Sequence, residues 1–344
     1  MVEYILRFKI EGDKEIPVLK KFFAIATLVL IALIVLVPGC THENEQVFKV
    51  AMVFDSPIAD DAFSTTCLRG AEKAQREFGI SLEITESLTA ADSARLQRDY
   101  AKSKENNLII CIAGPSHSES LSQLSLDFPK QQFALVDGDI ADRPNISSLV
   151  SRDNESSFLA GAVAAMVSQT NQIGFIGGMD DPAFHRFLAG YQAGAQYINP
   201  ECRVIVDYAG TWANDGKTKA LALQQYQQGA DIIFGPAGAG SIGVIEAAIE
   251  KNLYAIGVDT DQSPLGPQNV LASTIKNVDV SVFEAIILSI EGKFSAGIQT
   301  SGLKEGGVGI ALNNSLSLLT PEIKARITEI EGKIVSGEIT VPAS

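Results

Sequence analysis

Residues 172–208 read QIGFIGGMDDPAFHRFLAGYQAGAQYINPECRVIVDY. The stretch contains a short apolar run at Gln172–Gly177, an amphipathic segment at Pro182–Asn199 and a second short run at Arg203–Tyr208. Short runs bounded by glycine or polar residues are typical of buried strands, and the longer segment has the period of a helix. The stretch therefore predicts a βαβ unit with two parallel strands, because the chain crosses the sheet through the helix.

The same alternation extends in both directions along the chain. Further strands are expected at Phe48–Asp55, Ser81–Ser87, Leu108–Ala113, Gln132–Asp137, Ile146–Val150, Asp231–Phe234, Tyr254–Asp259 and Leu271–Lys276. Further helices are expected at Asp61–Phe78, Ala91–Asn106, Ser116–Phe128, Glu155–Gln169, Asn214–Gln228, Ser241–Asn252, Val278–Glu291 and Thr320–Ser336. A sustained βαβ alternation predicts an α/β protein with helices on both faces of parallel sheets.

The number of strands is enough for two doubly wound lobes. One predicted strand and two predicted helices follow the strands and helices that complete the second lobe. These extra elements predict that the chain returns to the first lobe before it ends in the second. We expect an N-terminal lobe of residues 48–152 plus 271–297 and a C-terminal lobe of residues 153–270 plus 298–344. Two lobes joined by several crossings form a hinge with a cleft between them.

The N-terminus has the features of a targeting segment. Phe22–Val37 is apolar except for Thr27, follows Lys20-Lys21 and is shorter than the roughly 20 residues of a membrane span. It predicts a signal peptide over residues 1–39, of which residues 1–17 are interpreted as a mis-set start before Val18. The tail Val37-Pro38-Gly39-Cys40 looks like a bacterial lipobox, so we expect Cys40 to be lipidated, with residues 40–47 as a tether. The alternative is an uncleaved anchor helix.

Charge and composition exclude several classes of function. The chain has 27 Lys and Arg against 41 Asp and Glu, a net charge of −14, which disfavours a nucleic-acid surface. Four cysteines without CxxC spacing and three histidines indicate neither a metal site nor a disulfide framework, so no metal or cofactor is expected. Beyond Cys40, we expect Cys67, Cys111 and Cys202 to be buried as small apolar side chains.

Ligands of open parallel sheets bind beyond the carboxyl ends of the strands. The predicted strand ends carry Asp55, Asp137, Phe234 and Asp259, and Trp212 follows shortly after Tyr208. Carboxylates accept hydrogen bonds from sugar hydroxyls, and aromatic rings cover flat rings. No nucleophile and base pair accompanies them, so these residues favour binding over catalysis.

One motif favours an enzyme instead. Gly238-Ala239-Gly240-Ser241-Ile242-Gly243 matches GxGxxG between a predicted strand and a predicted helix, and Asp259 ends the next strand. This is most of a dinucleotide-binding fingerprint. Against it, the motif lies in the second lobe, no His or Lys is placed for hydride transfer, and nicotinamide cofactors are scarce outside the cytoplasm. A dinucleotide-dependent enzyme is the less favoured alternative, and Gly238 also fits a turn that approaches some other ligand closely.

Several segments together carry a family resemblance. They are Glu155–Gly161, Ile173–Asp180, Arg186-Phe187 with Gly190 and Gly194, Gln228–Phe234, Tyr254–Gln262, Lys276–Asp279 with Glu284–Ile286, and Ser336–Pro342. From Phe48 to Phe294, and more loosely to Pro342, the chain resembles the basic membrane protein family of lipoproteins, which includes PnrA-like nucleoside-binding proteins of ABC importers. The resemblance implies the type I periplasmic-binding-protein fold.

The resemblance also implies roles for individual residues. Where the family shows Ile-Asn-Asp-x-Ser-Phe-Asn, this chain has Ile58–Ser64, which keeps Asp60 and Phe63 but replaces both asparagines. Phe63 would stack on a base.

Four further positions match the family's pattern. Asp137 would accept hydrogen bonds from a base, and Trp212 would close the ring sandwich. Asp259 would take ribose hydroxyls, and Lys276 would reach the cleft.

Together these observations predict a lipid-anchored solute-binding protein on the extracytoplasmic face of the cell membrane. It would bind a small polar ligand with a ring, with a purine nucleoside as the best candidate, and present it to an ABC permease without catalysis. A receptor or regulator that senses a ligand with the same cleft is the main alternative.

Overall fold

The computed structural model describes residues 47–344 apart from 56, 61, 88, 113–117 and 212–214. The predicted signal peptide, Cys40 and Trp212 lie outside the described residues. Val47–Ser344 forms one compact unit. Among the described residues, no helix is both long and apolar enough to cross a membrane.

The first sheet has the strand order β11-β5-β4-β3-β1-β2, and all its neighbouring strands are parallel. Its strands are β1 (Lys49–Phe54), β2 (Ser81–Glu86), β3 (Leu108–Ile112), β4 (Gln132–Val136), β5 (Ile146–Ser151) and β11 (Gly297–Ser301). Its helices are α2 (Ala62–Phe78), α3 (Ala90–Ser103), α4 (Ser118–Asp127) and α9 (Val278–Ile290), and the short 3-10 turn η1 (Ile58–Asp60) precedes α2.

The second sheet has the order β12-β10-β9-β8-β6-β7, in which β12 alone is antiparallel to its neighbour. Its strands are β6 (Gln172–Gly177), β7 (Arg203–Tyr208), β8 (Ile232–Phe234), β9 (Tyr254–Gly257), β10 (Val270–Lys276) and β12 (Val308–Leu312). Its helices are α5 (Asp153–Val167), α6 (Pro182–Ile198), α7 (Asp215–Gln227), α8 (Ser241–Lys251) and α10 (Pro321–Ser336), with the 3-10 turns η3 (Gly238–Gly240) and η4 (Ser263–Leu265).

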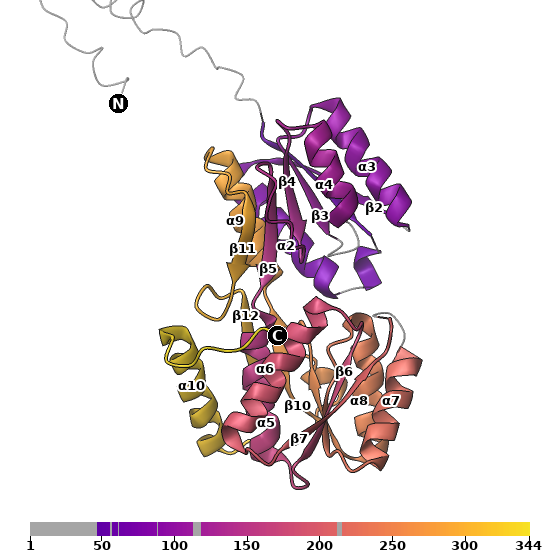
Figure 1. The fold of residues 1–344 in the computed structure, drawn as a ribbon, viewed down its shortest axis with the longest axis vertical. Coiled ribbons are helices and arrows are strands. Elements are labelled where there is room, and N and C mark those ends of the chain that lie inside the picture. The colour runs from indigo at the N-terminus through magenta and orange to yellow at the C-terminus, as the bar shows by residue number, and fades with distance from the viewer. Residues whose placement is uncertain (1–46, 56, 61, 88, 113–117, 212–214) are drawn as a thin grey trace, which may run out of the picture. The chain divides into compact units, whose positions relative to one another are not determined.

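Both sheets are covered on two faces because successive strand residues point to opposite sides. In β1, Val50, Met52 and Phe54 join the core under α2 and α9, whereas Ala51 joins the core under α3 and α4. The same alternation places Ile232 and Phe234 of β8 in one core of the second sheet and Ile233 in the other. The predicted α/β class with two doubly wound sheets is confirmed (Figure 1).

The predicted lobe boundaries were wrong at one strand on either side of α9. Residues 271–276 were expected in the first lobe, but β10 pairs with β9 and β12 in the second sheet. Residues 298–301 were expected in the second lobe, but β11 pairs with β5 in the first sheet. The physical reason is that sheet membership depends on pairing with strands distant in sequence, which the local pattern of residues does not report.

Within the described residues, the chain crosses between the sheets three times, after β5, after β10 and after β11. The crossings are hydrogen-bonded to one another. The Arg152 amide donates to the Ser301 carbonyl at 3.0 Å, and the Asn277 amide donates to the Gly307 carbonyl at 2.8 Å. The crossings therefore form a single connected hinge beside the carboxyl ends of β5 and β10.

Helices α5 and α6 approach closely because glycines line their contact. A Cβ atom at Gly190 would lie 2.1 Å from the Asn154 carbonyl oxygen, and one at Gly194 would lie 1.9 Å from that of Phe158. This approach places the first turn of α5, next to the hinge, beside the middle of α6.

Candidate functional site

Two carboxylates follow the carboxyl ends of strands in the left-handed backbone region. Asp137 follows β4 with a φ of 58°, and Asp259 lies just beyond β9 with a φ of 66°. Residues other than glycine adopt this conformation at a cost, and Asp and Asn are among the few that do so with some frequency. Both aspartates thus occupy sharp turns at the edges where a ligand of parallel sheets binds.

Lys276, the last residue of β10, links the two lobes. Its Nζ lies 2.6 Å from Oδ2 of Asp137 in the first lobe and 3.3 Å from Oδ2 of Asp153, the first residue of α5 in the second lobe. The exposed side-chain fractions are 9% for Lys276, 19% for Asp137 and 2% for Asp153. Charges buried to this extent need partners, and here each carboxylate has the same ammonium group.

The surroundings shift the pKa values of both second-lobe groups. Burial lowers the pKa of Lys276, but the attraction of Asp137, Asp153 and Asp259 outweighs it and leaves that pKa raised. Burial raises the pKa of Asp153 to about 6, because it exceeds the opposing attraction of Lys276 and Arg186. Lys276 is therefore charged at neutral pH, whereas Asp153 titrates in the mildly acidic range.

Two aromatic rings flank the ammonium group. Nζ of Lys276 lies 5.4 Å from the ring centroid of Phe63 on α2 and 5.7 Å from that of Phe187 on α6. Both distances are within the range of a cation–π contact. Phe63 is half-buried and Phe187 is buried, so the lysine has one aromatic neighbour from each lobe.

Two polar atoms near this cluster have no hydrogen-bond partner among the described residues. They are Oδ1 of Asp137, an acceptor, and Nε of Arg186, a donor. Buried polar groups are nearly always satisfied, so these two atoms keep the capacity for one further hydrogen bond each. The site is thus suited to a ligand that donates a hydrogen bond to Asp137.

A cavity of about 310 Å³ lies at Asp259, at the start of α8. Its lining comes mainly from η3, the first turn of α8 and the loop after β9, and Ala62 of α2 contributes from the first lobe. Gln262 holds this loop in place, since its side chain accepts from the Val258 amide at 3.1 Å and donates to Oγ of Ser241 at 2.9 Å. Asp259 belongs both to this cavity and to the charged surroundings of Lys276.

The GxGxxG motif forms part of this cavity. Gly238 has a φ of 57° and begins η3, while Gly243 lies in α8, where a Cβ would be 1.9 Å from the Asp215 carbonyl oxygen. The glycines therefore allow a tight turn and close packing of α7 against α8. Gly238 and Ser241 line the cavity.

The structure brings together four of the predicted site residues through Lys276: Phe63, Asp137, Asp259 and Lys276 itself. Gly238 shares the cavity with Asp259. Asp55 directly follows β1, at the same edge of the first sheet as Asp137 but with β3 between their strands. Asp60 ends η1, two residues before the first residue of α2.

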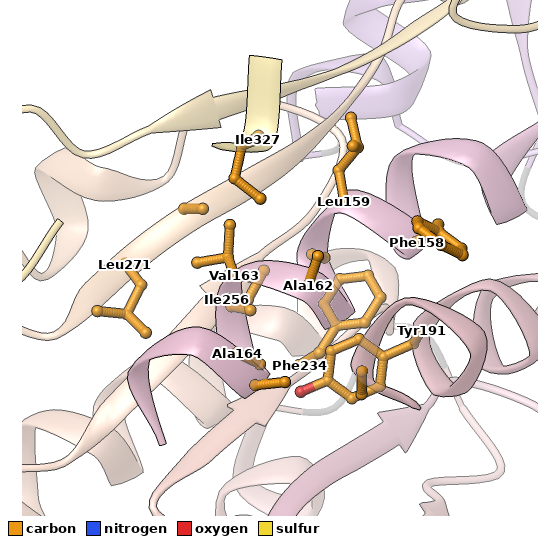
Figure 2. Packing of buried hydrophobic residues seen from close by; sticks show 14 of the residues in the cluster. Phe158, Leu159, Ala162, Val163, Ala164, Tyr191, Phe234, Ile256, Leu271 and Ile327 are labelled. Carbon is orange, nitrogen blue, oxygen red and sulfur yellow. The ribbon is translucent and has the colours of Figure 1, made fainter. Parts of the chain in front are cut away.

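The prediction that Phe234 contacts the ligand was wrong. Its side chain has no exposed surface and packs among Phe175, Phe187 and Tyr191, with ring centroids 5.9, 6.3 and 5.2 Å away. Figure 2 shows the rings of Phe234 and Tyr191 next to each other. The alternation of β8 directs this side chain into the core under α5 and α6 rather than toward the sheet edge. Phe187, which lies between Phe234 and Lys276, is the ring that reaches the site.

Sequence reasoning missed Asp153, Arg186 and Phe187 as site residues. Each lies in the first two turns of a helix, whereas the rule for parallel sheets concerns the ends of strands. A signal existed for Asp153, because an acidic residue begins a helix in which nearly every other side chain is buried. Arg186 and Phe187 lie in one of the segments that carry the family resemblance, but the resemblance implied no role for either of them.

The described residues form two doubly wound lobes that are joined by a hinge of three crossings. Polar groups gather at the carboxyl ends of the strands. This arrangement defines a solute-binding protein of the type I periplasmic-binding fold. A solved solute-binding protein of an ABC transporter system from Aeropyrum pernix has this fold, with a TM-score of 0.75 and 27% identity over 86% of this chain and 94% of its own.

Residues 47–344 match the family model described as ABC transporter substrate-binding protein PnrA-like, and the chain belongs to this family. Basic membrane protein A1 of Borrelia garinii subsp. bavariensis is 34% identical over 87% of this chain and 89% of its own length. The ABC transporter nucleoside-binding protein BmpA of Lactococcus lactis subsp. cremoris is 32% identical over 94% of this chain and 99% of its own length. The relatives are substrate-binding proteins and not enzymes, so the alternative of a dinucleotide-dependent enzyme is set aside.

Proposed function

We propose that this protein binds a purine nucleoside between its lobes and delivers it to the permease of an ABC importer. The observation that carries the proposal is Oδ1 of Asp137, a buried acceptor without a partner among the described residues, beside Lys276 and Phe63. An N–H group on the edge of a flat base would satisfy Oδ1, and the ring of Phe63 would cover the face of the base.

The second half of the ligand would occupy the cavity at Asp259. A volume of about 310 Å³ is at the lower end of the range of small-molecule pockets, roughly 300 to 1,000 Å³. The carboxylate of Asp259 would accept hydrogen bonds from sugar hydroxyls, and the glycine-rich turn at Gly238 would let the sugar approach the backbone. The nucleoside-binding name of the Lactococcus lactis relative supports the same class of ligand.

Isothermal titration with inosine, guanosine and adenosine tests this proposal, with free ribose and free bases as controls. We expect at least one nucleoside to bind, and each half of it to bind much more weakly, because only the whole molecule reaches both Asp137 and Asp259. Mass spectrometry of ligand that co-purifies with the protein gives an independent identification. The absence of binding to all three nucleosides by protein freed of retained ligand would contradict the proposal.

The matched variants are Asp137→Asn and Asp139→Asn. Asp139 is exposed and lies two residues beyond Asp137 in the chain. Loss of a charged hydrogen-bond acceptor weakens binding by about tenfold or more. We expect this loss for Asp137→Asn and an unchanged dissociation constant for Asp139→Asn.

We further propose that the protein is a lipoprotein held on the extracytoplasmic face of the membrane through Cys40. The motif Val37-Pro38-Gly39-Cys40 after an apolar leader supports this proposal. Metabolic labelling with a radioactive fatty acid tests it in the producing cells. Label should enter the wild-type protein and not Cys40→Ala, and equal labelling of the two would exclude Cys40 as the attachment point.

A further inference from the structure

We propose that Asp153 is a positioning residue of the ligand site, which holds the Lys276 ammonium at one oxygen of Asp137 and so leaves the other oxygen available to the ligand. This inference rests on the proposed function, in which the ligand donates a hydrogen bond to Asp137. Asp153 itself touches Lys276 and acts on the ligand only through it.

The argument begins with the hydrogen-bonding capacity of the lysine. An ammonium group has three N–H donors, and a carboxylate has two acceptor oxygens. Without Asp153, the ammonium of Lys276 would keep Asp137 as its hydrogen-bonded anion and Asp259 as a further attraction. The hydrogen bond that draws it to the Oδ2 side would be lost, and its remaining N–H groups could reach Oδ1 as well.

The observed arrangement differs from that symmetric one. Nζ of Lys276 is 2.6 Å from Oδ2 of Asp137, while Oδ1 has no partner among the described residues. A second N–H is directed to Oδ2 of Asp153 at 3.3 Å. Asp259 also attracts the ammonium, but the contact with Asp153 is a direct hydrogen bond, and its pull accounts for the position of the ammonium at one side of the Asp137 carboxylate.

Asp153 is well placed to act as a fixed anchor. It is 1% exposed and begins α5, directly after the first hinge crossing. The neighbouring Asn154 side chain donates to the carbonyls of Val341 and Pro342 at 3.0 and 3.1 Å, and Glu155 accepts from the Leu303 amide at 2.8 Å. The first turn of α5 is thus bound to two other segments, which fixes the carboxylate of Asp153 in space.

The charged groups around Asp153 determine how its effect depends on pH. Lys276 of β10 and Arg186 of α6 attract its carboxylate, whereas Asp137 after β4 repels it. Burial outweighs the attraction and raises the pKa of Asp153 to about 6. Below this pH, Asp153 loses its charge and its pull on Lys276, the ammonium moves toward Oδ1 of Asp137, and the ligand loses its acceptor.

The first test measures the dissociation constant of the tightest-binding of inosine, guanosine and adenosine. We expect Asp153→Ala to weaken binding about tenfold, the effect of one hydrogen bond to a charged group. Asp153→Asn keeps an acceptor but not the charge, so its loss should be intermediate. Glu322→Ala is the control, since Glu322 is also an acidic residue in the first turn of a second-lobe helix but is exposed. Unchanged binding by Asp153→Ala would overturn the proposal.

Two readouts separate positioning from a general structural role. In the background of Asp137→Asn, Asp153→Ala should weaken binding no further, because its effect passes through Asp137. Wild-type affinity should fall about tenfold from pH 7 to pH 5, whereas that of Asp153→Asn should be nearly constant. Additive losses in the double variant, or equal pH profiles, would contradict the proposal.

A crystal structure of Asp153→Ala without ligand tests the inference even if no nucleoside binds. We expect Nζ of Lys276 within hydrogen-bond distance of both oxygens of Asp137. An ammonium that stays at Oδ2 and leaves Oδ1 without a partner would show that Asp153 does not position it. Failure of nucleoside binding in the wild type would instead count against the proposed function alone.

Discussion

Lys276 at the end of β10 lies 2.6 Å from Asp137 at the end of β4, so that a strand of the second sheet contacts a strand end of the first through a buried ion pair. The pair makes the site sensitive to any change of charge, because a buried group without its partner retains the full cost of leaving water.

Lys276→Met should destabilise the protein strongly at neutral pH. It leaves Asp137 and Asp153 close together without the ammonium, and removal of one partner from a buried pair costs about 3 to 5 kcal/mol. The free energy of unfolding, measured with urea, should fall by about that amount at pH 7 and by less at pH 5, where Asp153 is protonated. Lys217→Met at the exposed start of α7 is the control and should change it little. A smaller loss at pH 7 than at pH 5 would contradict this account.

The pKa of Asp153 predicts a pH dependence of stability. Folding raises this pKa from 3.8 to about 6, so the folded protein binds more protons than the unfolded chain in that window. The contribution of Asp153 to the free energy of unfolding is therefore fully present below pH 4 and is lost as the pH rises toward 6, by about 3 kcal/mol at most. The difference between wild type and Asp153→Asn, followed by urea unfolding from pH 4 to 7, should show this decline. A difference that grows as the pH rises would mean that folding lowers the pKa of Asp153, and it would contradict this prediction.

The close approach of α5 and α6 predicts unequal effects of two glycine substitutions. Gly194→Ala places a methyl group 1.9 Å from the Phe158 carbonyl oxygen, which forces the helices apart and should cost about 2 kcal/mol or more. Gly332→Ala in the exposed middle of α10 meets nothing within 4 Å and should stabilise the protein by about 0.5 to 1 kcal/mol. Thermal unfolding measures both, and equal effects would show that the glycine at 194 is not required by packing.

Asp259→Asn should affect binding with little effect on folding. Asparagine tolerates the left-handed backbone at this position, so the turn after β9 is kept while the charge is lost. We expect nucleoside affinity to fall about tenfold by calorimetry, with a fall in the melting temperature of the unliganded protein that is small beside that of Lys276→Met, because Asp137 and Asp153 still pair with the ammonium. The control Asp142→Asn removes an exposed carboxylate and should leave affinity at the wild-type value. If both variants bind equally well, Asp259 does not contact the sugar.

The local elements could be predicted well from the sequence. The strands Gln172–Gly177 and Arg203–Tyr208 have the predicted bounds, because apolar runs and glycine turns report buried strands directly. β11 and β12 were missed, since GIQTS and VGIAL are short and carry small or polar residues without a clear alternation. The sheet to which β10 belongs depends on long-range pairing, which no local pattern encodes.

The site could be predicted only in part. Asp137 and Asp259 lie beyond the carboxyl ends of β4 and β9, where the rule for parallel sheets places ligand-binding residues. Lys276, the last residue of β10, was predicted from the family resemblance instead. The same rule failed for Phe234, because alternation within β8 and not proximity to its end decides where the ring points. The roles of Asp153 and Phe187 could not be predicted without the packing of α5 against α6. That packing depends on the glycines between the two helices and on the position of the hinge.

The burial of Cys67, Cys111 and Cys202 has a practical consequence for measuring motion between the lobes. All three are thiols outside any disulfide with at most 4% exposed surface, and burial raises the pKa of Cys111. Buried thiols react slowly with electrophilic labels. One cysteine introduced on the surface of each lobe could therefore carry a pair of spin or fluorescent labels in a background that keeps these three native cysteines. Distances between the labels would then report opening and closing of the cleft as nucleoside is added.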